Sequence, residues 1–330
     1  MGVSVRARVG DAGHRPVHPG YFADPFVLRL PDDTYAAYGT NSTATSTESV
    51  FEVLLSNDLE TWRSAGPALV RLDSEMGDEY WAPEVCFRDG SWWMYYSVGH
   101  GISGHHLRVA RADEPTGPFQ DLGVDLTPHE TFAIDPHPFR DADGQWYMYF
   151  ARDVLDAQRP GTHLAVARLP EPAQLTDTQS ILEPYADWQI YERERPMYGG
   201  TFDWHTLEGP TVVRRHDRYW MTFSGGAWTG PGYAVSWASS ADPVGPWVAA
   251  PPSAPPLLES GVSLIGPGHN SLVVGPGGGD RIAFHAWNAD HSVRQMHVAS
   301  IDFTAGAPVV LPASPDSVVA PDPQGGSDRD

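Results

Sequence analysis

The sequence contains little cysteine, no lysine and no long hydrophobic run. Cys86 is the only cysteine among the 330 residues, so no disulfide can form within the chain. It lies in the apolar run Val85-Cys86-Phe87, which favours a small buried thiol over a reactive one. No apolar run approaches the length of about 18 residues that a membrane span needs. The stretch 1–16 lacks the apolar core of a signal peptide, and we therefore expect a cytoplasmic protein.

Positive charge is also scarce. The chain has 21 basic residues, all of them arginine, against 42 acidic residues, which gives a formal net charge of −21. Proteins that bind nucleic acid need basic surface to neutralise phosphates, and docking on an anionic membrane needs the same. The charge therefore excludes nucleic acid and membrane as expected partners and favours a neutral substrate.

Aromatic residues are abundant, and they recur in a repeated pattern. A short aromatic segment follows a polar turn five times, and each copy opens with the Asp or Gly residues that are typical of β-hairpin turns. The five copies are 31–40, 88–97, 142–151, 215–224 and, with a weaker match, 278–286. Such a regular repeat predicts an architecture built from equivalent units.

A second element follows each hairpin. It has alternating apolar residues and ends in most copies with a Pro- or Gly-containing turn, at 51–62, 106–119, 163–175, 233–247 and 296–303. Each unit spans roughly 55–70 residues, which suits four strands with their loops. The sequence thus predicts an all-β fold, a five-bladed β-propeller with four-stranded antiparallel blades around a central channel. A β-sandwich with aromatic-rich hairpins is the alternative.

We expect the propeller to form one domain over residues 1–312. The remaining segment, 313–330, is rich in Pro, Gly and Asp, a composition that indicates a partly disordered tail.

Acidic residues recur at one point of the repeat. Eleven residues before the first aromatic residue of each hairpin lie Asp24, Trp81, Asp135, Glu208 and, in a weaker alignment, His269. Equivalent positions on the innermost strands of a propeller converge at one mouth of the channel. Carboxylates that converge there lose hydration without an evident partner, so packing alone does not explain them.

Three converging carboxyl groups suit the hydrolysis of glycosidic bonds. One carboxyl group gives a proton to the leaving oxygen, and an ionised carboxylate activates water or attacks carbon. A third carboxylate nearby raises the pKa of the acid by like-charge repulsion. Trp81 offers an apolar face of the kind on which sugar rings stack.

The order and spacing of several motifs resemble glycoside hydrolase family 43, whose members are five-bladed propellers acting on arabinose- and xylose-containing glycans. The match covers about residues 15–310 and rests on ADP (23–25), WAPEV (81–85), IDPHPF (134–139), LEGP (207–210), GPGHNS (266–271) and Arg294-x-Met296. The resemblance implies an inverting mechanism with Asp24 as general base, Glu208 as general acid and Asp135 as modulator of the acid's pKa. Base and acid would stand about 6.5–9.5 Å apart, with room for a water.

The resemblance implies further site residues. Arg294 matches an arginine that reaches the sugar in the innermost subsite, and the other residues expected at the pocket are Trp81, Phe22, His285 and Trp287. His269 matches a histidine on the propeller axis that in many members binds calcium, mostly through waters. Calcium prefers oxygen ligands, so a hydrogen-bonded structural histidine suits this position equally. We expect no required cofactor; a structural calcium on the axis is the one metal that the resemblance implies.

The implied substrate is a neutral arabino- or xylo-oligosaccharide derived from plant cell walls. We predict removal of α-L-arabinofuranosyl residues, with β-xylosidase or endo-arabinanase activity at the same site as alternatives. A carbohydrate-binding propeller without activity is the alternative from another functional class. The insertion at 152–205 is expected to shape the pocket wall and to set specificity.

Overall fold

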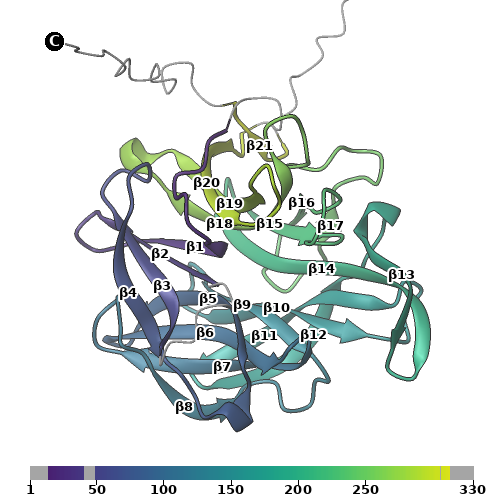
Figure 1. The fold of residues 1–330 in the computed structure, drawn as a ribbon, viewed down its shortest axis with the longest axis horizontal. Coiled ribbons are helices and arrows are strands. Elements are labelled where there is room, and N and C mark those ends of the chain that lie inside the picture. Colours follow the sequence, from purple (N-terminus) through teal and green to yellow (C-terminus); the bar gives the residue numbers. More distant parts are fainter. Residues whose placement is uncertain (1–13, 41–48, 305, 313–330) are drawn as a thin grey trace, which may run out of the picture.

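Five groups of four antiparallel strands surround a common axis in the computed structural model of the protein (Figure 1). The structure describes residues 14–40, 49–304 and 306–312. The five-bladed β-propeller predicted from the repeats is confirmed, and the β-sandwich alternative is wrong. The predicted tail at 313–330 lies outside the described residues. Within the described ranges, no helix has the length and apolar character to cross a membrane.

The strands of each blade follow one another along the chain, and the first strand lies nearest the axis. Blades 1 and 2 consist of β1 (Ala23–Arg29), β2 (Tyr35–Thr40), β3 (Ser49–Ser56), β4 (Arg63–Val70), β5 (Glu79–Arg88), β6 (Ser91–His100), β7 (Ser103–Ala112) and β8 (Gln120–Asp125). Blade 3 consists of β9 (Ala133–Arg140), β10 (Trp146–Val154), β11 (Gly161–Glu171) and β12 (Gln174–Leu182). Blades 4 and 5 consist of β14 (Gly200–Arg215), β15 (Arg218–Gly225), β16 (Ala234–Ser240), β17 (Val248–Ala249), β18 (Ile265–Val274), β19 (Asp280–Trp287), β20 (Arg294–Asp302) and β21 (Val309–Val310).

One additional strand interrupts the repeat between blades 3 and 4. This strand, β13 (Ile190–Met197), pairs with the beginning of β14, and the β13–β14 hairpin projects from the propeller (Figure 1). Short parallel pairing between β11 and β14 joins blades 3 and 4 into one continuous sheet. The described residues also form short 3₁₀ helices at Ser74–Met76, Asp187–Gln189 and Pro276–Gly278.

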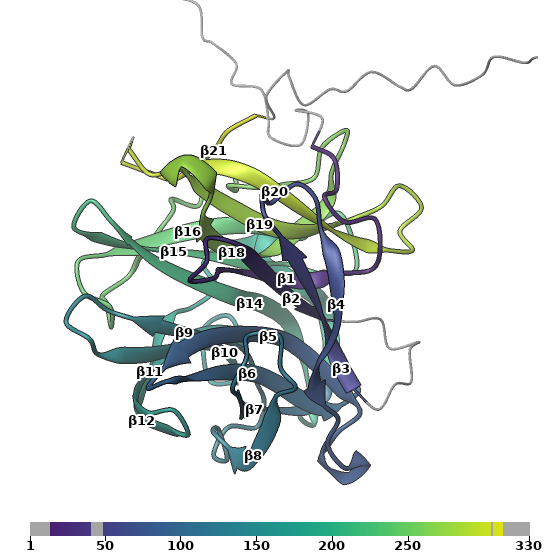
Figure 2. The same cartoon turned by 90° about the vertical axis from the view of Figure 1, so that its left-hand side faces the viewer.

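The N-terminal segment closes the ring of blades. The innermost strands contact one another in the circular order β1, β5, β9, β14 and β18, and β18 returns to β1. Ahead of β1, the backbone N–H groups of Val17 and Phe22 donate to the carbonyls of Met296 and Arg294 in β20. Figure 2 shows the N-terminal strand beside the strands of blade 5. Closure therefore joins the first and last blades of the chain by backbone hydrogen bonds.

Aromatic side chains of the predicted hairpins fill the space between blades. Tyr38, Tyr95 and Tyr149 are fully buried and occupy related positions in the second strands of blades 1, 2 and 3. Their hydroxyls donate to the carbonyls of Pro115, Pro172 and Pro243, which lie in outer turns of the following blade, at 2.6, 3.0 and 2.6 Å. Buried tyrosines need such partners. The proline-containing turns of the sequence repeat are therefore acceptors that fix each blade against its neighbour. Cys86 is a free, half-buried thiol among these apolar side chains.

Each innermost strand also contains a β-bulge, where its pairing with the second strand shifts. One residue of each bulge has positive φ: Asp24 (51°), Ala82 (47°), Asp135 (61°), Gly209 (57°) and His269 (41°). Bulges bend a strand and re-aim its side chains. The bulges thus bring the side chains of Asp24, Asp135 and His269 to one end of the channel.

The positions of the bulges correct the alignment made from the sequence. Asp24, Asp135 and His269 are structural equivalents, but Trp81 and Glu208 lie one residue before the bulge residues of their blades. The hairpin of the first two strands is one residue shorter in blades 2 and 4. The pairs Glu84–Tyr95 and Thr211–Thr222 are 11 residues apart in the chain, whereas the equivalent pairs of blades 1 and 3, Phe26–Tyr38 and His137–Tyr149, are 12 residues apart. Counting eleven residues back from the first aromatic residue therefore reaches the residue before the bulge in blades 2 and 4 instead of the bulge residue itself.

The backbone N–H of each bulge residue donates to a side chain of the preceding blade. In blades 2, 3 and 5 the acceptors are hydroxyls of Thr40, Ser97 and Ser224, at 2.9, 3.1 and 2.7 Å. In blade 1 the acceptor is Nδ1 of His285, at 3.0 Å. All four acceptors pair with the residue that precedes the bulge of their own blade. Blade 3 has Ala151 at this position, and the Gly209 N–H donates to the Asp135 carboxylate instead, at 2.9 Å.

Removal of one of these hydroxyls is expected to destabilise the fold. Ser224→Ala leaves the buried N–H of His269 without an acceptor, which costs about 1–3 kcal/mol. The control is Ser64→Ala, because Ser64 accepts an exposed N–H that water can serve, and its expected cost is within about 0.5 kcal/mol. Urea unfolding of the two variants measures the difference; equal costs would contradict the role assigned to the bulge contacts.

Candidate active site

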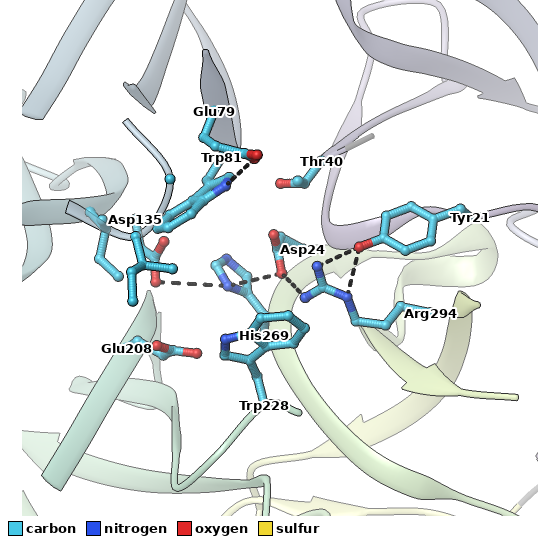
Figure 3. Close-up of a pocket in the computed structure, with 13 residues that line it drawn as sticks. Tyr21, Asp24, Thr40, Glu79, Trp81, Asp135, Glu208, Trp228, His269 and Arg294 are labelled. Carbon is cyan, nitrogen blue, oxygen red and sulfur yellow. Dashed lines mark hydrogen bonds and ion pairs between the residues drawn. The ribbon is translucent and has the colours of Figure 1, made fainter. Parts of the chain in front are cut away.

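The three carboxyl groups of the sequence prediction line one cavity at the end of the channel. The cavity has a volume of about 300 Å³, and Asp24, Asp135 and Glu208 reach it from β1, β9 and β14 (Figure 3). All three side chains are largely buried. Their environments differ, and the differences decide which of them carries a proton.

Asp24 lies against the positively charged side of the cavity. Its Oδ1 is 3.5 Å from Nη1 of Arg294 and 3.5 Å from Nδ1 of His269. Burial alone raises the pKa of this carboxyl, but His269 and Arg294 outweigh that effect and hold the pKa well below its ordinary value. The lowered pKa keeps Asp24 ionised in neutral and mildly acidic solution.

Glu208 lies on the opposite side of the cavity, away from the guanidinium (Figure 3). Burial raises its pKa to about 7, and the charge of Asp24 acts in the same direction. The hydroxyl of Tyr233 donates to Oε1 at 2.5 Å and opposes this rise. The ring of Tyr233 fits because residue 268 is glycine: a Cβ there would lie 1.8 Å from the ring. Glu208 thus keeps its proton in mildly acidic solution and is about half protonated near neutral pH.

Asp135 is the most enclosed of the three acids. Its pKa is raised well above the ordinary value by burial first, and then by the charges of Glu208 and Asp24. Its Oδ2 accepts the N–H of Gly209, the residue after Glu208. Asp135 is therefore linked through one peptide unit to Glu208, whose charge contributes to the raised pKa of Asp135.

His269 lies between two of the acids. Its Nδ1 is 3.5 Å from Asp24 and 3.8 Å from Asp135, and burial lowers its pKa. A Cβ on Gly209 would lie 3.2 Å from this imidazole, and the φ of +57° at Gly209 also favours glycine. The close packing of Gly209 against the ring keeps His269 on the axis.

The donors around the axis do not form a direct metal site. Among the described residues, no group of three or more His, Cys, Asp or Glu side chains could hold an ion together. Nδ1 of His269 faces two carboxylates, and a lone imidazole is a poor ligand for calcium. The predicted calcium, held through waters beside His269, stays a prediction, and no chemical step below depends on it.

Arg294 forms one wall of the cavity together with aromatic rings. Its Nε and Nη2 donate to the hydroxyl of Tyr21 at 3.0 and 2.5 Å, and its guanidinium carbon lies 4.5 Å from the ring centroid of Trp228. The side chain is only 8% exposed, so its charge is little screened by solvent. This arrangement keeps Nη1 directed at Asp24 and available to a hydroxyl group of a ligand.

Trp81 forms the facing wall. Its ring stacks on His105 with a centroid distance of 3.6 Å, and its indole N–H donates to Glu79 at 3.3 Å. Both contacts fix the ring, which borders the cavity. A fixed indole provides the flat apolar surface that the sequence predicted for sugar stacking.

Three of the predicted site residues do not border this cavity. Phe22 is 1% exposed and lies in the core between blades 1 and 5, and His285 is fully buried beneath Asp24. Trp287 stacks against Trp228 and donates its indole N–H to the Trp228 carbonyl at 2.9 Å. Within the described residues, Phe22, His285 and Trp287 support the residues that line the cavity rather than lining it themselves.

Several residues at the site were not singled out from the sequence. Tyr21, Thr40, Glu79 and Ile102 line the cavity, and Tyr233 contacts Glu208 from behind. They lie in loops or at strand ends, where the hairpin repeat gives no signal. The position of Tyr21 next to the ADP motif was the one clue available for this group.

The site has the parts that hydrolysis of a glycosidic bond requires. An ionised carboxylate and a protonated carboxyl group face one cavity, together with a buried guanidinium and aromatic walls. Fold and site together are those of a propeller glycoside hydrolase.

Comparison with known proteins identifies the family. A model described as "Glycosyl hydrolases family 43" matches residues 14–308, and the chain belongs to this family. The β-D-galactofuranosidase xynD of Aspergillus niger is 29% identical over 305 residues, which cover 87% of this chain and 80% of that protein. An extracellular exo-α-(1→5)-L-arabinofuranosidase of Streptomyces avermitilis is 28% identical over 224 residues, 64% of this chain and 44% of that protein. The chain thus matches less than half of the Streptomyces enzyme's length.

A solved structure agrees with this assignment. The crystal structure of a thermostable family-43 glycoside hydrolase superimposes with a TM-score of 0.79 at 27% identity, over 95% of this chain and 99% of that one. The resemblance inferred from the motifs is confirmed, and the protein is a glycoside hydrolase.

The contact between Tyr233 and Glu208 gives a prediction about proton affinity. Tyr233→Phe removes a hydrogen bond that favours the carboxylate, so the pKa of Glu208 is expected to rise above about 7. The rise should be about one to two units, because a hydrogen bond to a charged group contributes about 1.5–3 kcal/mol and one unit corresponds to about 1.4 kcal/mol. ¹³C NMR titration of glutamate-labelled protein measures it, with Glu208→Gln to identify the signal. Tyr185→Phe, which removes a hydroxyl bonded to Ser236, is the control and should leave the titration unchanged.

Proposed function

We propose that this family-43 enzyme is an inverting α-L-arabinofuranosidase that removes terminal residues from oligosaccharides. Asp24 acts as the general base, Glu208 as the general acid, and Asp135 as the modulator that orients the acid. The observation that carries this proposal is the contrast between Asp24, held ionised by Arg294 and His269, and Glu208, whose pKa is raised to about 7.

The contrast leads to a specific reaction course. Glu208 donates its proton to the glycosidic oxygen as the bond to the anomeric carbon breaks. Asp24 takes a proton from a water that attacks this carbon from the opposite face, which inverts its configuration. Nη1 of Arg294 is placed to hold a hydroxyl of the sugar beside Asp24.

The preference for a terminal arabinofuranosyl group is supported by two features. Tyr21, Trp228 and Arg294 form a wall on the Asp24 side of the cavity, which suits a substrate that ends there. One similar protein is named as an exo-acting arabinofuranosidase and another as a galactofuranosidase, both of which take five-membered sugar rings. β-Xylosidase and endo-arabinanase activities are the alternatives.

A substrate panel tests this proposal. We expect kcat/KM for 4-nitrophenyl α-L-arabinofuranoside to exceed that for the β-D-xyloside and the β-D-galactofuranoside by about tenfold or more. Linear arabino-oligosaccharides should shorten one residue at a time, and proton NMR should show the inverted anomer first. Net retention would exclude Asp24 as the base, and cleavage within the chain would exclude the terminal mode of action.

The dependence of activity on pH follows from the two pKa values. Glu208 must be protonated to act as the acid, so kcat/KM should fall as the pH rises through about 7. Asp24 must be ionised to act as the base, and its lowered pKa places the acidic limb below the ordinary range of aspartate.

Glu208→Gln should abolish this basic limb and slow hydrolysis of oligosaccharides by about 10²–10⁴-fold while binding is retained. If the wild-type protein binds these sugars but hydrolyses none of the substrates, the carbohydrate-binding alternative replaces the proposal.

A further inference from the structure

A second, smaller cavity adjoins the first. It has a volume of about 70 Å³, and five residues line both cavities: Trp81, Ile102, Ile134, Glu208 and Trp228. Its remaining wall comes largely from the β13–β14 hairpin, through Arg195 and its neighbours Tyr191, Met197 and Trp204. The hairpin lies within the insertion at 152–205 that the sequence marked as a pocket wall.

The position of Glu208 indicates which part of a substrate the second cavity receives. Glu208 borders both cavities, whereas Asp24 and Arg294 border only the main one. The general acid protonates the oxygen that joins the cleaved sugar to the leaving group, so it must lie between the two. The second cavity therefore lies on the leaving-group side. This step rests on the roles proposed above for Asp24 and Glu208.

Arg195 presents hydrogen-bond donors in this cavity. Its guanidinium lies 4.7 Å from the ring centroid of Tyr191 and 5.7 Å from that of Trp204, which orient its plane. The side chain is 13% exposed, and Nε forms an ion pair with Glu192 at 3.5 Å. Its Nη atoms donate no hydrogen bond to any residue that the structure describes. A guanidinium held by aromatic rings with both Nη groups free is prepared for an external acceptor.

Asp153 fixes the hairpin over the cavity. Its two carboxylate oxygens accept from Thr162 at 2.8 Å and from the hydroxyl of Tyr198, at the tip of the hairpin, at 2.6 Å. The Tyr198 contact spans from the hairpin to the end of β10. Because the hairpin is anchored at its tip, the cavity exists before a ligand arrives, and Arg195 is held in place within it.

We propose that the β13–β14 hairpin forms the binding subsite for the leaving group, a single neutral sugar ring, and that Arg195 donates hydrogen bonds to its hydroxyl oxygens. Tyr191 supplies apolar surface for the ring, and the buried Trp204 supports Arg195 from behind. The Nη groups, which donate to none of the described residues, supply the polar contact. Since the contact lies outside the main cavity, Arg195 selects the leaving group and not the sugar that is cleaved off.

The test compares two leaving groups on one cleaved sugar. Arg195→Ala should lower kcat/KM for a disaccharide, such as α-1,5-linked arabinobiose, by about 10–100-fold. For the 4-nitrophenyl glycoside, whose leaving group has no hydroxyls, the loss should stay within about threefold. Arg195→Lys keeps a positive charge without the planar fork and should give an intermediate loss on the disaccharide.

Controls separate binding from folding and from the identity of the substrate. Arg193→Ala removes an exposed arginine of the same hairpin, paired with Asp203, and should leave both rates unchanged. A thermal unfolding midpoint and a basic pH limit like those of the wild type exclude loss of structure and disturbance of Glu208. Equal losses on both substrates, or no loss on the disaccharide, would overturn the proposal. If the wild-type enzyme prefers another sugar, the proposed function is wrong. The role of Arg195 is then decided by comparing the losses of kcat/KM on the disaccharide and on the 4-nitrophenyl glycoside of that sugar.

Discussion

The structure of the site depends on the bulge that interrupts each innermost strand. A bulge removes one backbone N–H from the pairing within its own blade, and a buried N–H without an acceptor is costly. The preceding blade supplies the acceptor in every case, so neighbouring blades are joined at the same places where side chains turn toward the axis. The same set of contacts therefore holds neighbouring blades together and positions the side chains of the site.

The exception in this set links two of the acids. Four blades have a hydrogen-bond acceptor opposite the residue that precedes the bulge: Thr40, Ser97, Ser224 and His285. The equivalent residue of blade 3 is Ala151, whose side chain cannot accept a hydrogen bond. In blade 3 the carboxylate of Asp135 serves as the acceptor instead and binds the N–H of Gly209. The absence of a hydroxyl at residue 151 therefore fixes the carboxylate of Asp135 beside Glu208.

Electrostatic differences across one small cavity then separate the acids. The three carboxyl groups are similarly buried, so burial raises the pKa of each. His269 and Arg294 both lie 3.5 Å from the Asp24 carboxylate, and of the three acids only Asp24 has its pKa lowered. The orientation of Arg294 depends in turn on Tyr21 and Trp228, which come from outside the repeat. Loop residues thus determine the protonation states of strand residues.

The sequence by itself determined the five-bladed architecture and the convergence of Asp24, Asp135 and Glu208, because a repeat in the chain becomes rotational symmetry in the fold. Its alignment was wrong by one residue at Trp81 and Glu208, since hairpin turn length is a local property that a fixed count ignores. Phe22, His285 and Trp287 were predicted to line the pocket, and only the tertiary structure decided that they lie behind the cavity wall. Only the tertiary structure showed that three further residues belong to the site: Tyr21, Arg195 and Tyr233. Each reaches the site from a segment whose path depends on contacts distant in sequence.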